Sequence, residues 1–264
     1  DFDEKQWTWD NLKIAEANFT DNVVAFMAKR VSSLPENTKR LLELAACIGS
    51  IFDDLTLRII AEKISIKKDL EIAILEGLIF PLKNNQYKFA HDRVRQAAYS
   101  LIPENTKQTT HLTIGQLLYD SLSEEEQQEK LLDIVNHLNY SVELIEAADF
   151  KITLLNLNIE AGIKAKKQLA FEAAIRYFEQ SKQLLPSDHW TTHYELSARV
   201  YELLTEICLL VRNFEYMEKY SAVALDKIQD LTQRLKIYQI KIISYVTQAK
   251  LDKGLELVDE LFPS

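Results

Sequence analysis

The chain has 264 residues, only five of them glycine, and a formal net charge of −9 at pH 7. The glycines lie too far apart to form a G-x-x-x-x-G-K-[ST] phosphate loop or a G-x-G-x-x-G dinucleotide motif, which excludes both nucleotide-binding loops. No uncharged run is long enough to span a membrane, and the two distantly spaced cysteines are typical of a reducing compartment. We therefore expect a cytoplasmic chain with no membrane segment. Its first residue is Asp1 and not Met, which suggests a fragment of a longer protein.

The first 105 residues predict a lead-in and a small domain with both helices and strands. Residues 1–32 are expected to form a linker and a lead-in helix. The elements expected next are helices at about 35–48, 53–63 and 68–77, a β-hairpin at 79–89 with Asn84-Asn85 at its tip, and a helix at about 91–102. Three helices followed by a two-stranded wing is the plan of a winged helix-turn-helix, so we place a winged-helix domain at 33–105.

Residues 106–264 predict consecutive antiparallel helix pairs. Ser123 and Glu126 have the spacing of a capping box at a helix start. In a tetratricopeptide (TPR) unit, small residues lie where the two helices cross. Three units with that spacing, at steps of 43 and 37 residues, contain Ala161-Gly162, Ala174, Phe178, Ser181 and Pro186; Leu204, Met217, Ser221 and Ala224; and Tyr245, Gly254, Val258 and Leu261. The expected fold class is mainly α: a winged helix with a small β-hairpin, then a TPR-like repeat array at 106–264.

A longer helix is predicted inside this array, because apolar residues recur there at alternating steps of four and three. The series runs through Trp190, Tyr194, Ser197, Tyr201, Leu204, Cys208 and Val211. His189 and His193 are spaced i, i+4, which would place two imidazoles on one helix face. A zinc site of the H-E-x-x-H type needs Glu after the first His, and Trp190 stands there instead, so we expect no metal.

His91 follows the second hairpin strand directly, at the start of a predicted helix. Backbone N–H groups at a helix N-terminus can bind an anion together with the imidazole. The alternative is that His91 and Asp92 only cap this helix, and the residues alone leave both interpretations open. Nucleophilic catalysis has no support, because the sequence contains no G-x-S-x-G elbow and no activated cysteine context. We therefore expect no enzyme activity from this segment.

Many winged helices bind DNA, so DNA is the first partner to test against the sequence. The predicted recognition helix, residues 68–76, carries three acidic side chains and no Arg, Asn or Gln to read base edges. The acidic excess of residues 106–264 also opposes binding to a phosphate backbone. Nucleic acid is therefore not the expected partner.

Several motifs, taken in order, resemble one known class of signalling protein. They are Thr20-Asp21-Asn22-Val23-Val24, Leu44-Ala45-Ala46-Cys47-Ile48-Gly49-Ser50-Ile51-Phe52-Asp53, Glu76-Gly77-Leu78-Ile79, Phe89-Ala90-His91-Asp92-Arg93-Val94, Ala97-Ala98-Tyr99-Ser100-Leu101-Ile102-Pro103, His111-Leu112-Thr113-Ile114-Gly115 and Val135-Asn136-His137-Leu138-Asn139. The series resembles the region that follows the ATPase core in bacterial signal-transduction ATPases with numerous domains (the STAND class). The matching type is the large hybrid that joins a serine/threonine kinase, an ATPase, helical repeats, a GAF sensor and a histidine kinase.

The resemblance implies that the winged helix closes over the nucleotide site of an ATPase domain upstream of this chain. Ala90-His91-Asp92 is similar to the Met-His-Asp motif of plant resistance proteins, whose His contacts the ADP phosphate, although position 90 departs from the motif. His91, Asp92 and Arg93 are therefore the nucleotide-sensing candidates. ADP or ATP would be bound only through the upstream ATPase domain, and the chain itself would hold no cofactor.

The sequence thus favours a non-catalytic regulatory fragment of a signalling ATPase and kinase, with the winged helix as a latch. Its partners would be its own upstream ATPase domain, downstream signalling domains and a protein or peptide of unknown identity. The first helices of the repeats would line a polar groove for that partner, with candidates Asn156, Lys166, Arg199, Glu202 and Glu206. The alternatives are a DNA-binding transcription regulator and a purely structural spacer.

Overall fold

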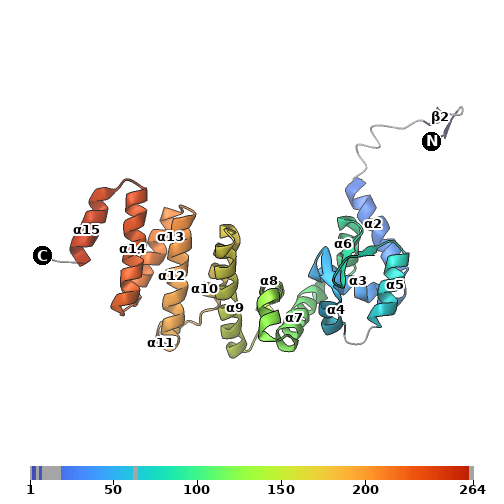
Figure 1. The fold of residues 1–264 in the computed structure, drawn as a ribbon, viewed down its shortest axis with the longest axis horizontal. Coiled ribbons are helices and arrows are strands. Elements are labelled where there is room, and N and C mark those ends of the chain that lie inside the picture. Colours follow the sequence, from blue (N-terminus) through green and yellow to red (C-terminus); the bar gives the residue numbers. More distant parts are fainter. Residues whose placement is uncertain (1, 4–5, 8–18, 62–64, 262–264) are drawn as a thin grey trace. The chain divides into compact units, whose positions relative to one another are not determined.

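The computed structural model describes residues 2–3, 6–7, 19–61 and 65–261. The chain divides into two compact units, Asp1–Leu144 and Ile145–Ser264. Both units are mainly helical, and the first also contains a small three-stranded sheet (Figure 1). Among the described residues, no helix has the length and apolarity needed to cross a bilayer. Part of the predicted linker and lead-in helix at 1–32 lies outside the described residues.

Unit 1 begins with two very short strands, and the three strands of the sheet then lie between helices in the chain order. Its elements are β1 (Phe2–Asp3), β2 (Gln6–Trp7), α2 (Phe19–Ser32), α3 (Glu36–Ile48), β3 (Ile51–Asp53), α4 (Asp54–Ile60), α5 (Ile66–Leu75), β4 (Ile79–Pro81), β5 (Gln86–Phe89), α6 (Asp92–Ser100), α7 (Glu104–Ser121), α8 (Glu124–Tyr140) and the 3-10 turn η1 (Val142–Leu144).

The predicted hairpin is confirmed. β4 and β5 pair antiparallel, and Asn84 and Asn85 at the tip have φ of 57° and 55°, the left-handed region that Asn tolerates best among residues with a Cβ. The sheet also has a third strand that the sequence did not predict, because β3 pairs with the other edge of β5. The order of α3, α4, α5 and the hairpin follows the prediction, and the winged-helix class stays a prediction.

The sheet covers an apolar core in unit 1. Phe52 of β3 and Phe89 of β5 are both buried, with ring centroids 5.4 Å apart. They lie in the same core as Leu41 and Leu42 of α3, which are also fully buried. One polar pair is buried as well: the Thr38 hydroxyl donates to Asp69 of α5 at 2.5 Å. Asp69 lies in the predicted recognition helix, and its carboxylate is taken up by this internal bond.

Helices α7 and α8 belong to unit 1, whereas the sequence placed residues 106–144 in the repeat domain; the compact units part after Leu144. One link is an ion pair between Lys130 of α8 and Asp53, the N-cap of α4, with 2.5 Å between Nζ and Oδ2. Burial alone would raise the pKa of Asp53, but hydrogen bonds from Lys130 and Thr56 bring that pKa below its ordinary value.

The predicted capping box is confirmed, because the Ser123 side chain accepts from the Glu126 N–H and the Glu126 side chain accepts from the Ser123 N–H.

The described part of unit 2 consists of three helix pairs and the short helix α11. Its elements are α9 (Ala148–Lys167), α10 (Phe171–Leu184), α11 (His189–Thr192), α12 (Tyr194–Leu210), α13 (Phe214–Lys227), α14 (Leu231–Thr247) and α15 (Leu251–Leu261). The pairs are α9–α10, α12–α13 and α14–α15 (Figure 1).

The turn inside each pair has the same geometry. Leu169, Arg212 and Ala249 have φ of 61°, 58° and 57°, and they are 43 and 37 residues apart, the predicted steps. At each turn the N–H of the next residue bonds to a carbonyl five residues back, from Ala170 to Ala165 in the first pair, and the N–H of the left-handed residue bonds three residues back. These are Schellman C-caps, which usually have glycine at the left-handed position. Here none of the three does.

The helices of the first pair cross where the sequence placed small residues. A Cβ added to Gly162 would lie 2.3 Å from the ring of Phe178, so only glycine allows α9 and α10 to approach this closely. Ala161, Ala174 and Ser181 are buried at the same crossing. The corresponding Leu204, Met217, Ser221 and Ala224 of the second pair are buried too.

The prediction of one long helix from Trp190 to Val211 is wrong at its start. The chain forms the four-residue α11 and then breaks at His193, which has φ −136° and ψ 48°. The buried Ser197 hydroxyl lies 3.1 Å from the His189 carbonyl and 2.8 Å from the His193 carbonyl, so it offers these oxygens a partner outside the helix ladder. His189 and His193 therefore do not share one helix face, and the His189 ring bonds to Ser197 at 2.8 Å.

Candidate functional site

The three nucleotide-sensing candidates lie together at the first turn of α6, directly after β5. His91 is the N-cap in extended backbone, and its Nδ1 accepts the Arg93 N–H at 3.1 Å. Asp92 accepts from the Ser50 hydroxyl at 3.1 Å, and Arg93 donates to Gln96 at 2.8 Å. His91 and Asp92 are exposed and Arg93 is half-buried. The capping interpretation of His91 is thus what the geometry shows.

This cap also fixes what the exposed edge of the imidazole can do. A nitrogen that accepts a backbone N–H carries no proton, so the ring proton of neutral His91 is on Nε2. Nε2–H is then a donor on an exposed side chain at the start of α6, where the N–H groups of Arg93 and Val94 are already bonded to His91. An anionic oxygen at the positive end of the helix is a suitable acceptor for this imidazole N–H.

The five partner-binding candidates of the repeats all lie in unit 2, but four of them have partners within the unit. Lys166 of α9 pairs with Glu206 of α12 at 2.7 Å, and Glu202 of α12 pairs with Lys236 of α14 at 3.4 Å. These ion pairs connect the first helices of consecutive pairs. The Asn156 amide donates to the Ile152 carbonyl one turn earlier.

Arg199 is the remaining candidate. It is exposed on α12, and no hydrogen bond or ion pair ties it to another of the described residues. Of the predicted groove, the Arg199 guanidinium is therefore the part that stays available to a partner.

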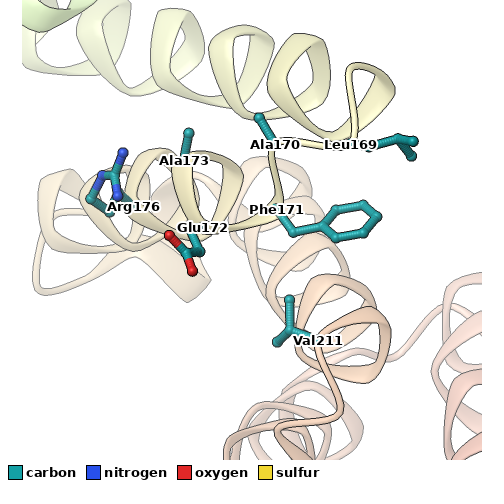
Figure 2. A pocket seen from close by; sticks show the side chains of 7 residues that line it. All are labelled: Leu169, Ala170, Phe171, Glu172, Ala173, Arg176 and Val211. Atoms are coloured by element: carbon teal, nitrogen blue, oxygen red, sulfur yellow. The ribbon is translucent and has the colours of Figure 1, made fainter.

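A pocket of about 500 Å³ lies at the turn between α9 and α10, where the sequence predicted no site. Figure 2 shows Leu169 and Phe171 projecting to the same side, with Val211 at the end of α12 near them and Glu172 and Arg176 farther along α10. The left-handed turn residue Leu169 is largely exposed there. The lining combines apolar side chains with one acid and one base.

Two histidines of unit 1 form a pair that the sequence also missed. His111 of α7 and His137 of α8 face each other with 2.8 Å between their Nδ1 atoms, and the Tyr99 hydroxyl lies 3.1 Å from His111 Nε2. Burial lowers the pKa of His137 to about 4, and it lowers the pKa of His111 as well. The neutral forms are therefore the stable ones in this fold.

The two cysteines are not activated as nucleophiles. Burial raises the pKa of Cys47 to about 12 and that of Cys208 to about 11, which opposes the thiolate form that a nucleophile needs. Within the described part of the chain, no cluster of three or more His, Cys, Asp or Glu side chains has the geometry to hold a metal ion.

Comparison with known proteins finds similarity to a curated protein and to a solved structure. The chain is 26% identical over 317 aligned residues to "Hybrid signal transduction histidine kinase G" of Dictyostelium discoideum, a match that covers 96% of this chain and 9% of that protein. The chain thus spans about a tenth of its relative. A crystal structure of a STAND protein with a tetratricopeptide repeat sensor from Pyrococcus horikoshii matches 86% of this chain and 37% of its own, with 16% identity and a TM-score of 0.39. No family model matches the chain.

The similarity to a signal-transduction kinase agrees with the predicted resemblance at the level of a signalling protein. The sequence identified His91 as a candidate because its position between a predicted strand and a predicted helix is visible there. The pocket and the histidine pair had no such signal, since each depends on how two helices pack. The two histidines are 26 residues apart in the chain.

Proposed function

We propose that the chain is a non-catalytic regulatory segment of a larger signalling protein. Unit 1 acts as a winged-helix latch on an ATPase domain that precedes it, and unit 2 acts as a TPR-like platform for protein binding. The observation that carries the proposal is the similarity along almost the whole chain to a hybrid signal-transduction histidine kinase, of which it spans 9%. Nucleotide belongs to the ATPase domain, and the kinase output belongs to other domains of the longer protein.

The latch is supported by the imidazole N–H of His91 at the start of α6. His91 Nε2–H is exposed and not engaged in the cap, so it can donate to a phosphate oxygen of ADP held by the neighbouring ATPase domain. Asp92 is held by Ser50 and Arg93 by Gln96. These bonds fix the first turn, so that the imidazole is presented in one orientation.

The platform role is supported by what unit 2 leaves open. The ion pairs of Lys166 and Glu202 order the repeats, while Arg199 and the pocket at Leu169 remain exposed. A peptide that carries an acidic group for Arg199 and an apolar side chain for the pocket is the partner that this surface suits.

The test is the basal kinase activity of the longer protein with two substitutions at one position. His91→Asn keeps a good N-cap but removes Nε2–H, and His91→Ala removes both. If the latch restrains the output through the imidazole, both variants raise basal activity severalfold. If the role of His91 is only to cap α6, His91→Asn behaves as the wild type, and this result would refute the latch.

A further inference from the structure

The forward side of each helix pair in unit 2, meaning the side that contacts the next pair, can be identified from the first two pairs. Lys166 of the first pair bonds forward to Glu206. From the second pair, Glu202 bonds forward to Lys236 and Glu218 bonds forward to Lys241.

The second pair also makes apolar contacts to the third pair from its forward side. Ala198 and Ala224 are buried in one cluster with Ile237 of α14. The forward positions are therefore known for both polar and apolar contacts.

The three helix pairs can be aligned on their left-handed turn residues. Leu169, Arg212 and Ala249 occupy the same place in the turn of each pair. With that alignment, the forward positions of the third pair are Leu235, Gln239, Val246 and Leu255, which we call the forward face. Leu235 corresponds to Ala198, Gln239 to Glu202, Val246 to Lys166 and Leu255 to Glu218.

The forward face differs from its equivalents in exposure. Leu235 is 41% exposed, whereas Ala198 is 2% exposed. Val246 and Leu255 are 57% and 64% exposed. These side chains occupy positions that a neighbouring pair covers elsewhere in the same unit, and no described element covers them here (Figure 1).

The forward face also differs in polarity. Where the first two pairs use Lys166, Glu202 and Glu218, the third has Val246, Gln239 and Leu255. A set of apolar side chains without a formal charge suits an apolar helix surface and excludes a partner that binds through ion pairs. In helical repeat arrays, a terminal pair that faces water has a polar outer surface, and this pair does not.

We propose that the forward face binds a further antiparallel helix pair of the same repeat type, which follows in the same longer polypeptide. The first helix of that pair lies against α14 and α15 as α14 lies against α12 and α13. The first helix of that pair carries apolar residues at the positions that correspond to Lys236 and Lys241 of α14. This inference shares with the proposed function only the premise of a longer polypeptide, and its test measures no nucleotide and no kinase output.

The experiment is hydrogen exchange of the α14 and α15 amides, measured in the 264-residue chain and in the longer protein. We expect exchange at least tenfold slower in the longer protein. Leu255→Glu in the longer protein should return exchange to the fast rate. Leu75→Glu, at an exposed leucine of α5, should not.

Removal of the helix pair that directly follows Ser264 should also return exchange to the fast rate. Equal exchange in the two proteins would overturn the proposal, and so would protection that survives this removal. A 264-residue chain that dimerises in sedimentation at micromolar concentration, and that Leu255→Glu makes monomeric, would assign the forward face to a second copy and overturn the proposal as well.

Discussion

The pair of His111 and His137 makes the stability of unit 1 depend on pH. His137 is buried, and the groups that face the pair are Tyr99 of α6, Lys107 of α7 and Tyr140 of α8. One assignment of protons satisfies both contacts. The Tyr99 hydroxyl donates to His111 Nε2, and His111 Nδ1–H donates to His137 Nδ1. Protonation of both rings would put two donors face to face.

The magnitude follows from the pKa of His137, about 4 in the fold and about 6.5 in the unfolded chain. Above pH 6.5 the ring is neutral in both states, so stability does not depend on it. Below that pH only the unfolded state binds the proton, and each pH unit costs about 1.4 kcal/mol. The free energy of unfolding should therefore fall by about 2 kcal/mol by pH 5 and about 3 kcal/mol by pH 4. His111 acts in the same direction, because its pKa is lowered too.

The assay is urea unfolding at several pH values between 7 and 4.5, followed by hydrogen-exchange mass spectrometry of peptides from α7 and α8. His137→Gln keeps a polar partner for His111 but cannot be protonated, so it should remove most of the dependence on pH. His193→Gln, in unit 2, is the control and should leave that dependence unchanged. Equal pH profiles for the wild type and His137→Gln would refute the reasoning.

Two further predictions concern the helix pairs. Gly162→Ala should lower the free energy of unfolding of unit 2 by about 2 kcal/mol in urea unfolding followed by circular dichroism, because its Cβ would clash with the Phe178 ring; an unchanged midpoint would show that α9 and α10 separate without cost. Leu169→Gly should raise the free energy of unfolding by about 1 kcal/mol, since glycine adopts φ of 61° without strain; a lower thermal midpoint would contradict the left-handed turn.

Sequence patterns predicted those parts of the fold that depend on local chemistry. The Asn84-Asn85 tip, the Ser123 capping box and the crossing at Gly162 each follow from the conformation or size of one or two residues. The repeat steps were found by the same reasoning. The Schellman turns were not, because the usual glycine signal is missing where Leu169 stands.

The sequence did not predict features that depend on distant contacts. β3 has three residues, too few for an alternating pattern, and it is a strand only because β5 lies beside it. The break before α12 is accompanied by the carbonyl contacts of the Ser197 hydroxyl. For the candidate site, the position of His91 could be predicted, but its protonated nitrogen could not, because that depends on the bond from the Arg93 N–H.

The most direct test of the latch is the rate at which the longer protein releases ADP. A fluorescent ADP analogue bound to the wild type, His91→Asn and His91→Ala would be chased with unlabelled nucleotide in stopped flow. The account predicts release at least tenfold faster from both variants, since each lacks the Nε2–H donor. Release from His91→Asn at the wild-type rate would contradict it, because capping alone would then explain His91.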